Sequence, residues 1–227
     1  NLLGVKSLDF QYLWKQTAVW QNLFDHLQSP TCVVETFNLN GNSFDDDKAI
    51  PLFSTLAKNS SLKSLNLSGC LLQVGDATWT ALSTCLQSPN SGLKKLDLCY
   101  SSITYETLLS FASSLSNNKN MTELVMYTDP DWTKRWESFP RLMCSTSTIM
   151  ETFDSNHTLE RVVKAANQPK AIEGHLKRNH RTNKFDVARQ KIIDVHFNGI
   201  IDMQHFIDIG LEILPREISW AAGGGLS

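Results

Sequence analysis

The segment LKSLNLSGC, residues 62–70, decides the fold. Its first, fourth and sixth residues are leucine and their neighbours are mostly polar, so the end of the frame alternates as a half-buried β-strand does. Cys70 follows eight residues after the start of the frame, where a short side chain can satisfy backbone groups as the chain turns away. The segment therefore predicts a short strand followed by a turn.

The same frame recurs along the chain at intervals of 28 to 31 residues. The copies VKSLDF, VETFNL, LKSLNL, LKKLDL and MTELVM begin at Val5, Val34, Leu62, Leu93 and Met121. A sixth, degraded copy, LERVVK, begins at Leu159. In the three middle copies the turn position holds Asn42, Cys70 and Ser101, and an apolar residue expected to re-enter the core follows two positions later as Phe44, Leu72 and Ile103.

Between the frames, apolar residues recur with helical spacing, as at Leu52, Phe53 and Leu56. A strand and a helix of this combined length cannot bury their apolar sides alone. Neighbouring units must therefore stack, with the strands in a parallel sheet and the helices in an outer layer. The sequence predicts an α/β solenoid.

The repeat length and the Asn or Cys turn position resemble the leucine-rich repeat proteins, specifically the ribonuclease-inhibitor-like subclass. The resemblance covers residues 1–127 well and 128–167 poorly. It implies a horseshoe-shaped arc with a parallel concave sheet. We expect a repeat array over residues 1–167 with about five to six repeats. No cap precedes Val5, so the array is expected to be truncated at its N-terminus.

The pattern decays after Tyr127. Pro130 and Pro140 predict an irregular unit with a kinked or split helix. Residues 168–227 read as helices without the repeat, one of them marked by Phe185, Ala188, Ile192 and Val195 and another lying over 203–214. A helical C-terminal cap is the predicted role of this segment. The runs VARQKIIDVHF and LPREISW resemble uncharacterised repeat proteins typical of diatom genomes, which implies architecture only.

The composition is that of a globular protein without a strong charge bias. The 227 residues hold 21 Lys plus Arg and 23 Asp plus Glu, with a net charge of −2. This balance makes nucleic acid an unlikely partner, and no apolar run is long enough to cross a membrane. Five cysteines without a C-x-x-C pair favour reduced thiols and an intracellular, cytoplasmic location.

Motifs for catalysis are absent from the sequence. It contains no G-x-G-x-x-G, G-x-x-x-x-G-K-Ser/Thr, H-E-x-x-H or G-x-Ser-x-G, so we expect no enzyme activity, cofactor, metal ion or small-molecule substrate. The basic run from His175 to Lys184 is interpreted mainly as a solvated loop, with an anion-binding or sorting patch as the alternative. Cys99, which follows a strand, is the thiol with the best prospect of reactivity.

The residues between the leucines are predicted to align in rows on the open side of the sheet. Two rows read Ser7, Thr36, Ser64, Lys95, Glu123 and Asp9, Asn38, Asn66, Asp97, Val125. The hypothesis is that this surface docks a protein partner, while the alternative is that polar residues only keep the sheet soluble. The candidate partner-binding residues are Asp9, Asn38, Asn66, Asp97, Lys95, Glu123, Tyr100 and Tyr127.

We therefore expect a non-enzymatic protein-protein interaction module or scaffold that binds a protein on its concave face. This expectation is partly analogy, because fold does not fix function. The alternative is a GTPase-activating or regulatory repeat region of a larger signalling protein, since some repeat proteins of this subclass stimulate the GTPase Ran. That role calls for a protruding arginine, and the first arginine here is Arg135, in the irregular unit.

Overall fold

The fold alternates short parallel strands with helices. The computed structural model describes residues 4–13, 17–116, 118–126, 139–163, 170–180 and 183–197. The strands are β1 (Ser7–Asp9), β2 (Thr36–Asn38), β3 (Ser64–Asn66), β4 (Lys95–Asp97), β5 (Glu123–Val125) and β6 (Arg161–Val163). The helices are α1 (Thr17–Gln28), α2 (Asp46–Leu56), α3 (Asp76–Gln87), α4 (Tyr105–Ser116), α6 (Phe139–Met143), α7 (Ile149–Asp154), α8 (Lys170–Asn179) and α9 (Lys184–His196).

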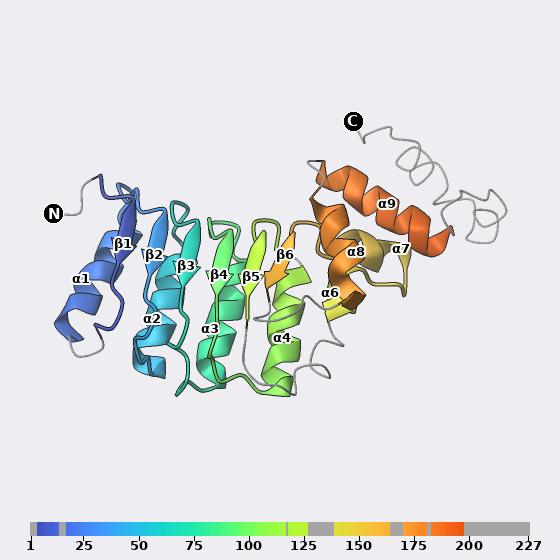
Figure 1. The fold of residues 1–227 in the computed structure, drawn as a ribbon. Helices are drawn as coiled ribbons and strands as arrows, with labels where there is room; N and C mark the ends of the chain where they lie inside the picture. Colours follow the sequence, from blue (N-terminus) through green and yellow to red (C-terminus); the bar gives the residue numbers. More distant parts are fainter. Residues whose placement is uncertain are drawn as a thin grey trace.

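The strands form one six-stranded parallel sheet in the order of the sequence, as Figure 1 shows. Each predicted frame supplies one strand, including the degraded copy at Leu159, which becomes β6. The pairing register joins Leu8, Phe37, Leu65, Leu96, Leu124 and Val162 across the sheet. All six side chains are buried, so this row forms the spine of the core. The architecture is consistent with a leucine-rich-repeat type of fold.

Helices α1 to α4 pack in sequence against one another and cover one face of the sheet (Figure 1). Their buried residues lie at helical spacing, for example Leu52, Phe53 and Leu56 in α2. Asp45 begins α2 by accepting a hydrogen bond from the Lys48 backbone N–H at 3.1 Å. The predicted outer helical layer is therefore present in the first four repeats.

The turn after each strand buries the predicted short side chain. Asn42, Cys70 and Ser101 are all buried, and the Cys70 thiol donates to the Leu39 carbonyl at 2.9 Å. Phe44 and Ile103 also re-enter the core as expected. Leu72 does not: it is 56% exposed, and Leu71 is buried in its place. The prediction for Leu72 was wrong by one residue, because the third repeat is 31 residues long and its turn has a different length.

A second set of buried polar side chains joins the end of each helix to the next strand. Asn59, Asn118 and Asn156 each donate through Nδ2 to the carbonyl of a preceding helix, Leu27, Leu86 and Leu115 respectively, at 2.5 to 2.7 Å. Each accepts through Oδ1 from the N–H that opens the next frame, on Leu62, Met121 and Leu159, at 2.6 to 2.8 Å. These amides satisfy helix-end groups that would otherwise be buried without partners.

The chain after β5 departs from the repeat. Among the described residues between β5 and β6, the helices α6 and α7 are both short, and Pro140 lies in the first turn of α6. Helix α8 packs on α6 and α9 packs on α7. In α9 the buried residues are Val187, Ala188, Lys191 and Ile192, while Phe185 is 69% exposed. The expectation that Phe185 belongs to the apolar side of this helix was therefore wrong.

The predicted helix over 203–214 and Arg135 lie outside the described residues. Within the described ranges, every helix falls short of the length and apolar character that crossing a lipid bilayer requires.

Candidate functional site

The sheet brings the predicted rows together on the face away from the helices. Ladder pairs join Ser7, Thr36, Ser64, Lys95, Glu123 and Arg161 in one row and Asp9, Asn38, Asn66, Asp97, Val125 and Val163 in the next. Each row thus gains a sixth member from β6. Side chains of the first five strands in these rows are exposed or half-buried, in contrast to the buried row between them. We call this surface the open face.

The Asp and Asn side chains of the open face also cap their own strands. Asp97 Oδ1 accepts from the Cys99 N–H at 2.9 Å, Asn66 Oδ1 from the Ser68 N–H at 2.9 Å, and Asn38 Oδ1 from the Asn40 N–H at 3.2 Å. Such turns suit Asp and Asn because their side chains reach the N–H two residues on. The backbone therefore has its own use for these residue types, which the sequence pattern alone did not reveal.

The charged row of the open face is internally paired. Glu123 lies between Lys95, at 3.4 Å, and Arg161, at 3.6 Å, on the two neighbouring strands. All three charges belong to adjacent strands, so the ion pairs form across the sheet. Exposed pairs of this kind contribute at most about 1 kcal/mol each to stability. The charges of the row therefore nearly balance. Its side chains can give up these ion pairs and form ion pairs with a partner instead.

Tyr100 lies at the end of the open face, in the turn after β4. Its backbone has a left-handed φ of 54°, and its side chain is 58% exposed. Tyr127, the other predicted aromatic anchor, lies outside the described residues. The structure therefore places seven of the eight predicted partner-binding residues, six in the two rows and one at their edge.

Asp97 supplies both a negative charge and a hydrogen-bond acceptor for its own strand end, and two substitutions separate these contributions. Asp97→Asn keeps an oxygen for the Cys99 N–H and should leave the free energy of unfolding nearly unchanged. Asp97→Ala removes that acceptor and should lower it by about 1 kcal/mol. Urea denaturation of both variants measures the difference. Equal stability of the two would show that the hydrogen bond contributes nothing.

The prediction of a loop for the basic run was wrong, because residues 175–179 lie in α8 and Lys184 begins α9. Lys177 lies 2.7 Å from Glu173 within α8. Arg178 lies 2.8 Å from Asp194 and Lys184 lies 3.0 Å from Glu160, and these two contacts tie α8 to α9 and α9 to the turn before β6. The arrangement favours a structural role over an anion-binding one.

The thiols divide between the core and the sheet edge. Cys32, Cys70, Cys85 and Cys144 are buried, and Cys99 is half-buried after β4. Burial raises the pKa of Cys70 to about 12 and that of Cys85 to about 11, so both stay protonated and unreactive at neutral pH. None of the five forms a disulfide, and the described residues contain no group of three or more metal-ligating side chains.

The sequence pattern did not anticipate a buried lysine. Lys191 of α9 is fully buried, and its Nζ donates to the carbonyls of Met143 and Asn156 at 2.6 and 2.7 Å. Burial lowers the pKa of Lys191 to about 7. His157, in the same turn as Asn156, is also buried, and desolvation lowers its pKa to about 4. This cluster holds α9 against the last turn of the repeat array, which favours a structural role.

Comparisons with known proteins add little to this geometry. No family model matches the sequence, and no curated protein matches it. Among solved structures, the chain is similar to one described as Leiomodin-1 Actin-Binding Site 2 (ABS2), with a TM-score of 0.42 and 16% identity. The similarity covers 87% of this chain and 91% of that chain. At this score the likeness carries no conclusion about fold or function.

Proposed function

We propose that the chain is a non-enzymatic protein-protein interaction module or scaffold, and that a protein partner binds on its open face. In this proposal the fold is a leucine-rich-repeat arc of the ribonuclease-inhibitor-like subclass, and the open face is its concave side. Residues 1–167 form the array and residues 168–227 its helical cap. The proposed partner-binding residues remain Asp9, Asn38, Asn66, Asp97, Lys95, Glu123, Tyr100 and Tyr127.

The observation that carries the proposal is the alignment of two rows of mostly polar residues over six paired strands. Parallel strands lie about 4.8 Å apart, so the open face extends about 24 Å from β1 to β6. A surface of that length with mixed carboxylates, amides and cations suits the polar contacts of another protein better than a small ligand, which binds in concave apolar sites. None of the five cysteines forms a disulfide, which supports an intracellular, cytoplasmic setting.

Affinity capture tests the proposal. The immobilised chain is exposed to a lysate of its source cells, retained proteins are identified, and the purified candidate is titrated against the wild type. We expect saturable binding that becomes about tenfold weaker in Asp9→Asn/Asp97→Asn, because this double variant removes two carboxylate charges and keeps both strand caps. The control is Asn90→Ser, at an exposed position in an inter-repeat turn.

Two outcomes would contradict the proposal. One is that no protein is retained above the level found with an unfolded chain. The other is that the purified candidate binds the double variant and the wild type equally well, which would place its site elsewhere.

A further inference from the structure

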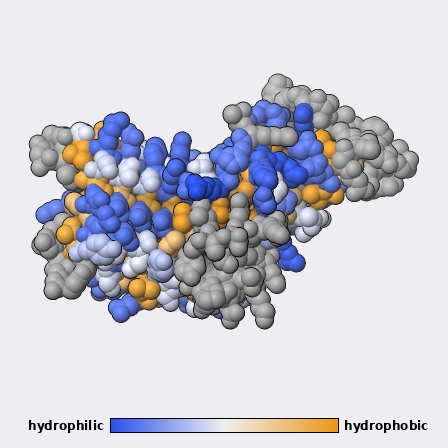
Figure 2. Space-filling model, viewed as in Figure 1, coloured by the Kyte–Doolittle hydropathy of each residue, from blue (hydrophilic) through white to orange (hydrophobic). Residues whose placement is uncertain are grey.

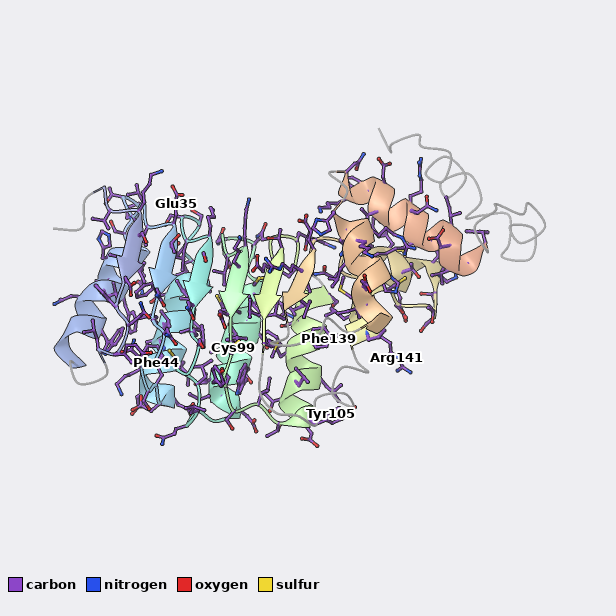
Figure 3. The ribbon with its side chains drawn as sticks, in the orientation of Figure 1. Glu35, Phe44, Cys99, Tyr105, Phe139 and Arg141 are labelled. Atoms are coloured by element: carbon purple, nitrogen blue, oxygen red, sulfur yellow. The ribbon has the colours of Figure 1, made fainter. Side chains whose placement is uncertain are left out.

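Exposed apolar side chains gather at the edge of the array where the strands end and the helices begin. Tyr12, Leu72, Tyr100 and Tyr105 are 66, 56, 58 and 41% exposed. We call this edge the strand-end rim; it consists of residues 10–13, 39–48, 67–76 and 98–107. In Figure 3 it runs past Phe44, Cys99 and Tyr105, on the opposite side of the sheet from Glu35. Exposed apolar side chains mark interaction surfaces where they form a contiguous patch.

Two of these tyrosines adopt a backbone conformation that normally favours glycine. Tyr12 has a φ of 57° and Tyr100 a φ of 54°, and the equivalent residues of the second and third repeats are Gly41 and Gly69, at 73° and 69°. A left-handed conformation is unfavourable for an L-residue other than glycine. Both side chains are largely exposed. The fold accepts glycine at this position in two of the four repeats, so the position does not require a tyrosine.

The hydrogen-bond ladder confirms that Tyr12, Gly41 and Gly69 occupy equivalent positions. Tyr12 N–H donates to Asn40 at 3.2 Å, Gly41 N–H to Ser68 at 2.9 Å, and Gly69 N–H to Cys99 at 2.8 Å, each time to a carbonyl of the next repeat.

Gly41 leaves space that the Tyr12 ring occupies. A Cβ added at Gly41 would lie 2.2 Å from Cε1 of the Tyr12 ring, whereas one added at Gly69 would approach only the Gly41 backbone, at 3.9 Å. The Tyr12 ring therefore lies directly beside Gly41. Among the described residues no side chain lies that close to Gly69, so another chain can approach the backbone there.

Charge divides the array between its two edges. The rim segments 39–48, 67–76 and 98–107 contain the carboxylates Asp45, Asp46, Asp47, Asp76 and Glu106 and one cation, Lys48. The opposite edge, residues 29–35, 57–63, 88–94 and 118–122, contains Lys58, Lys63, Lys94 and Lys119 and one carboxylate, Glu35. Figure 2 shows hydrophilic residues along that opposite edge, at the top of the view. The exposed aromatics lie on the acidic side.

We propose that the strand-end rim binds a basic segment of the partner, in which lysine or arginine side chains alternate with apolar ones. The apolar side chains pack on Tyr12, Leu72, Tyr100 and Tyr105, and the cations face the carboxylates of α2 and α4. Nucleic acids and anionic lipids carry the wrong charge for this edge. The inference rests on the proposed protein-binding function and names the class of segment bound.

Synthetic peptides test the rim directly. A fluorescent peptide of alternating lysine and leucine is titrated against the full chain by anisotropy, beside a peptide with glutamate in place of lysine. We expect saturable binding of the first peptide only, weakened by added salt. Tyr12→Gly/Tyr100→Gly should weaken it about tenfold or more, as aromatic anchors do. Asp47→Asn/Glu106→Gln, at two exposed first-turn positions, should weaken it and flatten the salt dependence. Val33→Ser, an exposed apolar residue on the opposite edge, is the control.

The glycine variants are not expected to fail through unfolding. Glycine relieves the left-handed conformation of each tyrosine, and this gain offsets the greater conformational freedom of glycine in the unfolded chain. Their thermal midpoints should therefore match that of the wild type.

Three results would overturn the rim proposal: no binding of the lysine peptide, equal binding of both peptides, or unchanged affinity in both rim variants. If affinity falls in Asp9→Asn/Asp97→Asn but not in the rim variants, the open face is the site and the rim is not. If the peptide binds the rim while lysate capture fails, the open-face proposal is wrong and the rim survives.

Discussion

Replacing Asn156 with alanine is expected to lower the free energy of unfolding by about 4 kcal/mol, one of the larger effects a single substitution can have. The Asn156 side chain is fully buried and makes four hydrogen bonds. Its Nδ2 donates to Leu115 and Asn118 at 2.7 and 3.3 Å, and its Oδ1 accepts from Thr158 and Leu159 at 3.0 and 2.7 Å. Alanine leaves all four backbone groups without this partner.

Two further variants sharpen this prediction. Asn156→Asp keeps the accepting oxygen but turns the second oxygen toward the Leu115 carbonyl, so it should cost as much as alanine. Asn90→Ala, at the corresponding but exposed position before Leu93, should change stability by less than about 0.5 kcal/mol. Urea denaturation measures all three. A small effect at Asn156 would show that the turn relaxes and that water replaces the amide.

Stability is expected to increase by about 2 kcal/mol between pH 7 and pH 9, because of Lys191. The pKa of Lys191 is about 7 in the folded chain and 10.5 in the unfolded chain. Between these values the unfolded chain binds more protons, so raising the pH favours folding. A neutral amine still donates two hydrogen bonds, so the contacts with Met143 and Asn156 can persist after deprotonation.

Other buried groups limit the pH range over which stability rises. Burial raises the pKa of Cys70 and Cys85 above the ordinary value of 9, so their contribution to stability is lost as the pH rises beyond 9. The pKa of His157, lowered from 6.5 to about 4, makes stability fall as the pH decreases through that range. A maximum near pH 9 is therefore expected.

The variant that tests this assignment is Lys191→Met, which keeps the length of the side chain and removes the titrating amine. Its stability should be flat between pH 7 and pH 9 while the wild type rises. Guanidinium denaturation at constant ionic strength gives both curves. Parallel curves would assign the rise to another group.

The repeat frame allowed the sheet to be predicted in detail because its period is long and its alternation is strict. A leucine frame leaves one way to place strands in register, and Leu65 pairs with Phe37 and Leu96 as that frame requires. The alignment of the open-face residues from strand to strand follows from the same frame. Their Asx turns could not be predicted from it, because an exposed Asp and a capping Asp look identical in sequence.

The sequence also contains a recurring asparagine before several of the frames. The residue three before each frame is Thr31, Asn59, Asn90, Asn118 or Asn156. This recurrence could have indicated a structural amide, yet it would have misplaced Asn90. Asn90 is exposed, and Ser88 Oγ instead donates to the Ala57 carbonyl at 2.5 Å, because the longer third repeat shifts the turn.

Lys191 could not be predicted, because its burial depends on packing outside the repeat. Helical periodicity alone assigns Lys191 to the solvent side. Nothing in the sequence predicts that the carbonyls of Met143 and Asn156 lie within hydrogen-bond distance of its Nζ. The same dependence on tertiary packing explains why Phe185 is exposed while Val187 is buried.

The inter-repeat hydrogen bonds also determine how the array can fold. Asn42 with Phe10, Cys70 with Leu39, and Asn118 with Leu86 each join residues 31 or 32 positions apart. These three contacts close chain segments of nearly the same length, so each repeat added within residues 10–118 meets a similar entropic barrier. Any adjacent pair of repeats can then nucleate, and folding spreads to both sides by nearest-neighbour propagation.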